Sequence, residues 1–146
     1  MVGCSLVPCP SAKLNTIRFK INSGQMENAI KVSRKLVRLQ PKNPIDINNL
    51  AWLLATRPKA SKLDCAEAIE LAKKAGQLVP IDNKELLVRT LVTRATAHHV
   101  SGDFSKALNV CSHAIETMNG MEQTPQVVIT LKDLKQRVQF YNTRLK

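Results

Sequence analysis

The sequence predicts an all-α protein, an α-solenoid of about three helix pairs followed by a C-terminal capping helix. Apolar residues recur at spacings of three and four, which is the period of an amphipathic helix. Aromatic residues make up only 3% of the chain, which suits closely packed helices better than a β-sandwich. The third observation is a repeat, because Ala29, Ala68 and Ala107 are 39 residues apart in turn. We therefore expect three units in register.

Length and charge limit the kind of protein this is. A chain of 146 residues with 44% hydrophobic residues is long enough for a packed core or a short repeat array. The net charge of +11 comes from residues 10–43 and 127–146, whereas residues 44–126 contain nine basic and nine acidic side chains. Such a charge suggests an acidic partner surface, nucleic acid or anionic lipid. A basic surface that keeps the array soluble and protects its ends is the simpler explanation, which we favour.

The first part of the chain predicts a tail and one helix pair. Residues 1–10 contain two prolines and no apolar period, so they predict a loose N-terminal tail. Residues 11–22 predict a first helix and 25–39 a second, and together they form a unit of about 11–41. The inner face of the second helix should consist of Ala29, Ile30, Ser33, Leu36 and Val37.

The middle unit, about 44–80, begins with a clear helix start. Asn43 is a good N-cap and Pro44 suits the first helical position. The helix should place Ile47, Leu50, Ala51 and Leu54 inward, with Trp52 on a flank. Two capping boxes then predict further helix starts: Asp64 with Glu67 in this unit, and Asp82 with Glu85 in the next.

The last unit, about 83–119, and the segment 124–146 complete the expected array. Gly102 and Asp103 predict a tight turn between the two helices of this unit. Thr124 and Pro125 predict the start of a final helix with a single apolar stripe. One buried face is what a terminal cap on a helical array needs, so we expect 124–146 to be a capping helix.

Small residues at crossing points connect these units to a known family. Where two helix backbones approach closely, a larger side chain would push them apart, and Ala51, Ala68, Ala95 and Ala107 stand at such points. Together with Leu91, Gly102, Phe104, Cys111, Ala114 and Pro80, this pattern resembles the tetratricopeptide repeat. The family repeat has about 34 residues, so the 39-residue spacing here is longer.

The resemblance implies a function and a site. Members of the family line a concave groove with the first helix of each pair, and the chain would then be a non-catalytic adaptor or scaffold for protein–protein interaction. Its partner would be a peptide segment of another protein, acidic or polar in character, because arginine offers directional donors. The implied groove residues are Arg18, Asn48, Asn49, Trp52, Arg89, Thr96 and His99. A solvated concave face without a ligand is the alternative for the same residues.

Two other interactions remain open. A basic stripe on one helix, consisting of Lys31, Arg34, Lys35 and Arg38, suggests a helical module that associates with nucleic-acid phosphates. No aromatic residues alternate with these cations, as base stacking would need, and a solvated outer face also explains them. Self-association through the ends of the array is a third hypothesis.

Catalysis, cofactors and metals are not expected. The five glycines are isolated and form no phosphate loop, and most of the eleven carboxylates fall at helix starts. His98 and His99 invite a metal hypothesis with Cys111 and His113, but adjacent helical residues point about 100° apart. The four cysteines lack zinc spacing and favour a reducing, cytoplasmic setting. No apolar run approaches the roughly 18 residues of a membrane span.

Overall fold

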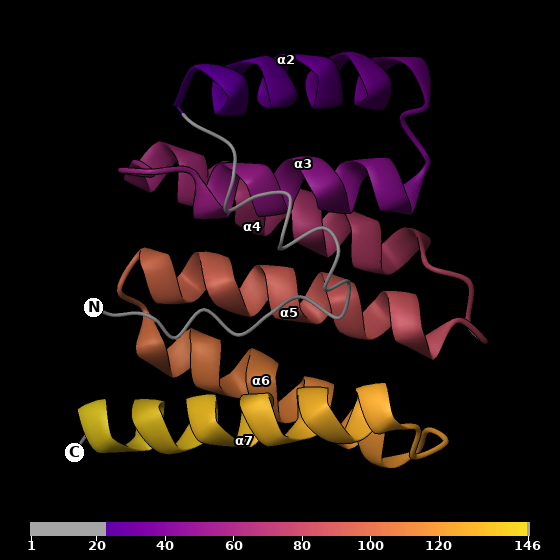
Figure 1. Cartoon of the computed structure of the whole chain (residues 1–146), viewed down its shortest axis with the longest axis vertical. Coiled ribbons are helices and arrows are strands. Elements are labelled where there is room, and N and C mark those ends of the chain that lie inside the picture. Colours follow the sequence, from indigo (N-terminus) through magenta and orange to yellow (C-terminus); the bar gives the residue numbers. More distant parts are fainter. Residues whose placement is uncertain (1–22, 146) are drawn as a thin grey trace.

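The computed structural model describes residues 23–145, which form six α-helices and no β-strand. The helices are α2 (Ser23–Leu39), α3 (Pro44–Thr56), α4 (Lys62–Leu78), α5 (Lys84–Val100), α6 (Phe104–Asn119) and α7 (Pro125–Arg144). Each helix packs on the next, and α3 also packs on α5. Figure 1 shows them stacked in chain order, from α2 at the top to α7 at the bottom. The all-α prediction is confirmed for this part of the chain.

Three of the predicted helix starts are confirmed in detail. The side chain of Asn43 accepts hydrogen bonds from the next backbone N–H groups, and Pro44 begins α3. Asp103 accepts from the backbone N–H of Lys106 at 3.1 Å. It follows Gly102, whose φ of +87° is a left-handed conformation that glycine adopts without strain. Thr124 caps α7 in the same way, since its hydroxyl accepts from a backbone N–H of the first turn.

Two predicted capping boxes are wrong in register. The box at α4 is formed by Ser61 and Asp64: each side chain accepts from the other's backbone N–H at 3.0 Å. Asn83, not Asp82, caps α5 and accepts from the backbone N–H of Leu86 at 3.1 Å. The cap must precede the first helical residue directly, and both helices begin at a lysine that follows Ser61 or Asn83. Serine and asparagine therefore compete with nearby aspartates for this role.

The buried apolar side chains form two clusters. One lies among α2, α3 and α4 and includes Met26, Ile30 and Leu54. The other lies among α5, α6 and α7 and includes Leu134 and Tyr141. The alanines predicted at crossing points, Ala51, Ala68, Ala95 and Ala107, are all completely buried. Small side chains let the helix axes approach at these positions, as the sequence suggested.

Two side chains differ from their predicted environments. Trp52 is not on an open flank but belongs to the α5–α7 cluster, because α3 packs on α5 as well as on α4. Leu36, expected on an inner face, is 43% exposed. Among the described helices, α2 packs closely on α3 alone, so much of its surface remains uncovered. The predicted tail 1–10 and helix 11–22 lie outside the described residues.

A helix that crosses a membrane must be both long and apolar. Within residues 23–145, no helix combines the length and the apolar character that crossing a membrane requires.

Candidate binding face

The structure places six of the seven predicted groove residues on two helices that pack on each other. We call these six the α3–α5 row: Asn48, Asn49 and Trp52 on α3, and Arg89, Thr96 and His99 on α5. On α5 the members follow one another by seven and three residues, so they share one side of the helix. Arg18 lies outside the described residues.

The row is largely buried. Asn48, Trp52 and Thr96 are 2%, 3% and 0% exposed, and the other three side chains are half-buried. A ligand would therefore touch Asn49, Arg89 and His99 most directly. The three buried side chains would lie at the edge of the surface that contacts a ligand, or would contribute to the packing of the helices.

The C-terminal half of the row is joined to α7. The Arg137 guanidinium donates a hydrogen bond to the Thr96 hydroxyl at 3.1 Å, and both side chains are buried. One turn further along both helices, the His99 Nδ1 atom and the Tyr141 hydroxyl are 2.8 Å apart. The Tyr141 ring is also completely buried. These two contacts attach α7 to α5.

Protonation supports the second of these contacts. Burial lowers the pKa of His99, and the nearby Arg137 cation lowers it further. Burial raises the pKa of Tyr141 to about 12, although Arg137 opposes that shift. Both side chains are therefore uncharged at neutral pH. One proton then lies between the His99 Nδ1 atom and the Tyr141 hydroxyl oxygen, as a hydrogen bond between the two atoms requires. Thr96 and His99 thus help to hold α7 on α5.

Arg137 is a buried polar residue that the sequence interpretation missed. Its side chain is only 4% exposed. Thr130, Leu134, Arg137 and Tyr141 recur on α7 at spacings of four and three, and all four are buried. This spacing is the signal that could have identified Arg137, since a charged residue in an apolar helical stripe indicates a specific internal contact.

Two side-chain atoms in the other half of the row lack such a contact among the described residues. The Oδ1 atom of Asn48 and the Nε atom of Arg89 are buried and have no hydrogen-bond partner among the described residues. Arg89 also makes no ion pair within residues 23–145. More than about nine in ten buried polar groups in proteins have a partner, so each exception requires an explanation. An acceptor on α3 and a donor on α5 are therefore enclosed without a hydrogen-bond partner among the described residues.

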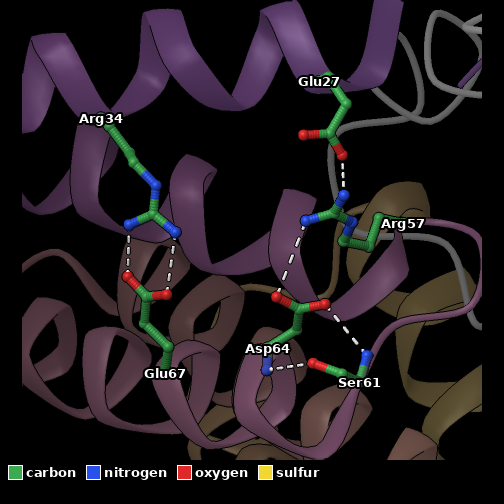
Figure 2. Close-up of polar contacts among 6 residues, drawn as sticks. All are labelled: Glu27, Arg34, Arg57, Ser61, Asp64 and Glu67. Atoms are coloured by element: carbon green, nitrogen blue, oxygen red, sulfur yellow. Dashed lines mark hydrogen bonds and ion pairs between the residues drawn. The ribbon is translucent and has the colours of Figure 1, made fainter. Parts of the chain in front are cut away.

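The predicted basic stripe is divided in the structure. Lys31, Lys35 and Arg38 are exposed on α2. Arg34 instead makes two hydrogen bonds to the Glu67 carboxylate on α4, at 2.5 and 2.9 Å (Figure 2). This fork-shaped pairing raises the pKa of Arg34, chiefly through the hydrogen bonds to Glu67. Only three of the four cations are thus available to phosphates.

A second group of ion pairs, centred on Arg57, connects α2 to the rest of the molecule. Arg57, which follows α3, pairs with Glu27 of α2 and lies 3.7 Å from Asp64 of α4. Asp64 also accepts from the backbone N–H of Ser61, so one carboxylate serves the cap and the ion pair (Figure 2). The position of α2 therefore depends on charged groups at two points, through Arg34 and through Arg57.

Two kinds of reactive group, cysteine thiols and possible metal ligands, occur among the described residues, and the structure places them as follows. Cys65 and Cys111 are buried free thiols, and burial raises the pKa of both. A thiol with a raised pKa is a poor nucleophile at neutral pH. Among residues 23–145, no three His, Cys, Asp or Glu side chains gather closely enough to hold a metal ion.

Comparison with known proteins adds no assignment to this geometry: no family model matches the chain, and no curated protein or solved structure matches it either.

Proposed function

We propose that the protein is a non-catalytic adaptor that holds a peptide segment of another protein along the α3–α5 row. The proposed architecture is a solenoid of tetratricopeptide-like pairs, in which α3 with α4 and α5 with α6 are complete pairs. The order of the described helices supports this, because each packs on the next and α3 packs on α5. In the same scheme α2 is the second helix of a first pair and α7 is the cap.

The observation that supports the peptide site is the presence of the Asn48 Oδ1 and Arg89 Nε atoms, buried without partners on adjacent helices. A peptide backbone presents N–H donors and carbonyl acceptors in alternation. A peptide that displaces the side chains covering these two atoms could donate to Asn48 and accept from Arg89. Leaving such atoms unsatisfied costs about 1–3 kcal/mol each, so their pairing in a complex would favour binding.

The charge of Arg89 indicates the character of the peptide. A guanidinium forms its strongest hydrogen bonds with carboxylates, often through two parallel contacts. Since Arg89 makes no ion pair within residues 23–145, a ligand carboxylate would meet no internal competitor among them. We therefore propose an acidic peptide. A reducing, cytoplasmic setting fits the same proposal, because Cys65 and Cys111 are free thiols.

The test is capture of partners from native lysate with the tagged protein, with and without nuclease, at low and moderate salt. We expect the wild type to retain some proteins after nuclease treatment. The Arg89→Met variant should not retain them. Lys74→Met is the matched control, because Lys74 is an exposed cation on α4, a helix that contributes no residue to the row. Equal recovery with Arg89→Met and with the wild type would contradict the proposal.

Nucleic-acid association is a second candidate, supported by the exposed cations Lys31, Lys35 and Arg38 on α2. The affinity of a protein that binds through phosphates falls steeply with salt. The logarithm of the binding constant decreases by roughly one unit per tenfold rise in salt concentration for each phosphate contact. Reversing Lys35 to Glu should therefore lower both affinity and slope. Binding that survives nuclease and is insensitive to this reversal would exclude the candidate.

Self-association through the α2 end is a third candidate. Val32, Leu36 and Leu39 are 58%, 43% and 69% exposed on that helix. A second copy could cover these side chains. Sedimentation velocity over a range of concentrations separates this candidate, which predicts a dimer, from the other two.

A further inference from the structure

The side of α5 opposite the α3–α5 row contains a second feature, a cleft of about 490 Å³ between α4 and α6. Arg94 and His98 of α5 line it, and the 100° step of a helix places them about half a turn from Arg89 and Thr96. Its walls come from both neighbouring helices and from the α5–α6 turn. They include Ile69, Glu70, Lys73, Asp103, Lys106 and Asn109. The volume lies within the usual range for small-ligand pockets.

Three cations and two carboxylates line this cleft. Lys73 is 3.7 Å from Glu70 on α4, and Lys106 is 3.7 Å from Asp103 at the start of α6. Both pairs are longer than good charge-assisted hydrogen bonds, which are about 2.7–2.9 Å, so each lysine can turn to another anion. One oxygen of Asp103 is already used to cap α6. The local charge is therefore positive.

Arg94 has no counterion among residues 23–145. It makes no ion pair within the described residues, and its Nε atom is buried without a hydrogen-bond partner there. A guanidinium in this state is ready to form two parallel bonds with an oxyanion. It lines the cleft from α5, whereas Lys73 lines it from α4 and Lys106 from α6.

His98 is a second group that points to a ligand. Its side chain lines the cleft, is 5% exposed, and makes no hydrogen bond to another described side chain. Burial lowers its pKa, and the cations Arg94, Lys106 and Lys73 lower it further, while Asp103 acts in the opposite direction. The ring thus experiences a positive field that an anion in the cleft would neutralise.

We propose that this cleft binds a phosphate dianion, free or as the monoester of a small molecule, through Arg94 with Lys73 and Lys106 on either side and His98 beneath. Phosphate suits the cleft better than a single carboxylate does, because it offers oxygens to a guanidinium and to two ammonium groups at the same time. The inference is independent of the peptide site, which lies on the other side of α5.

The test is a titration of the full chain with inorganic phosphate, followed by NMR signals of the histidine rings at constant ionic strength set with chloride. We expect a saturable shift of the His98 ring signals and a higher His98 pKa in saturating phosphate. His113, which is exposed on α6 and outside the cleft, should not respond. A parallel titration with glycerol phosphate shows whether the free ion or a monoester binds more tightly, and saturation by either supports the proposal.

Two substitutions test the residues. Arg94→Met should weaken phosphate binding by at least about tenfold, the loss expected for charge-assisted hydrogen bonds. Lys73→Met should weaken it less, and it provides a second variant if Arg94→Met does not fold. Lys74→Met removes a neighbouring cation that does not line the cleft and should leave the affinity unchanged.

Three results would overturn the proposal. The first is the absence of a saturable response of His98 to both phosphate compounds. The second is an equal response to chloride alone. The third is a loss of affinity in Lys74→Met as large as that in Arg94→Met and Lys73→Met, which would indicate a diffuse effect of charge rather than a site.

Discussion

The two end helices of the described array are held in different ways. Helix α7 is attached to its neighbours through buried side chains, including Leu134 and Tyr141, which are completely buried. Helix α2 buries Met26 and Ile30 but is otherwise joined to α4 and to the residue after α3 by ion pairs. Both helices leave large apolar side chains exposed on their outer surfaces. They differ in their polar contacts, because α7 uses the buried side chains of Arg137 and Tyr141 whereas the Arg34–Glu67 pair of α2 is about 40% exposed.

The polar contacts of α5 differ in the same way between its two ends, and this indicates where we expect a partner to bind. At the α7 end, the polar groups of α5 are satisfied by Arg137 and Tyr141. Toward α3, the buried polar atoms of Asn48 and Arg89 have no partner among the described residues. The α5–α7 contacts therefore stabilise the fold, whereas the α3–α5 end is where we propose that a ligand binds.

Removing the Tyr141 side chain should break the α7 end. Tyr141→Ala should lower the free energy of unfolding by about 3–5 kcal/mol, because a buried aromatic ring leaves a large cavity. Urea unfolding followed by circular dichroism gives the value. Phe140→Ala is the matched control, since Phe140 is 38% exposed, and its effect should be clearly smaller. Equal effects would show that Tyr141 is not central to this packing.

Enlarging the repeated alanines should affect the units unequally. Ala68→Leu and Ala107→Leu should each lower the free energy of unfolding by about 1–3 kcal/mol, because both side chains are completely buried at close helix contacts. Ala29 occupies the equivalent position of the first unit but is only half-buried. Ala29→Leu should therefore be tolerated better in thermal unfolding. A loss as large at Ala29 would mean that α2 is packed as tightly as the other helices.

Acid should weaken the α5–α7 half. The pKa values of His98 and His99 are lowered in the folded protein, mainly by burial, from an ordinary value of 6.5. As pH falls below about 6.5, the unfolded chain binds protons that the folded chain does not yet bind, so the free energy of unfolding decreases. Above that pH this contribution is fully present.

The measurement is urea unfolding followed by the fluorescence of Trp52, which packs with the α5–α7 cluster, at pH values of about 7.5 and 5.5. His98→Gln should reduce the pH dependence, whereas His113→Gln, at an exposed position, should not change it. The same pH dependence in His98→Gln and the wild type would exclude His98 as a cause.

The Arg34–Glu67 pair should have the smallest effect. Both side chains are about 40% exposed, at 40% and 39%, so a double-mutant cycle with Arg34→Met and Glu67→Gln should give at most about 1 kcal/mol. The coupling should nearly disappear in 1 M salt, where charges are screened within about 3 Å. A coupling that persists in high salt would show that the pair is effectively buried and that α2 is not held as described.

Local features of this fold could be predicted from the sequence, and long-range ones could not. Asn43 with Pro44, and Thr124 with Pro125, determine helix starts through bonds within one turn. The sequence predicts the cap of α4 at Asp64, whereas the structure has it at Ser61. Ser61, Asp64 and Glu67 are spaced three apart, so Ser61 with Asp64 and Asp64 with Glu67 both fit a capping box.

Contacts between distant residues depend on how helices cross. Arg34 and Glu67 are separated by 33 residues, and nothing in either segment indicates the other as a partner. Trp52 could not be placed either, since its burial depends on the contact between α3 and α5. The candidate row was implied by the resemblance to the tetratricopeptide repeat, whose members line a groove with the first helix of each pair. Which members contact α7 and which remain available depends on Arg137 and Tyr141, and only the structure gives that division.

The most direct test compares two substitutions on one side of α5, Arg89→Met and Thr96→Val, by thermal unfolding and by affinity for acidic peptides selected from a random library. Thr96→Val removes the oxygen that accepts from Arg137, so it should lower the free energy of unfolding by about 1–3 kcal/mol. Arg89→Met should leave the unfolding temperature nearly unchanged and weaken peptide binding at least about tenfold. Unchanged affinity in Arg89→Met, or failure to select any peptide with the wild type, would contradict the division between a structural end and a binding end.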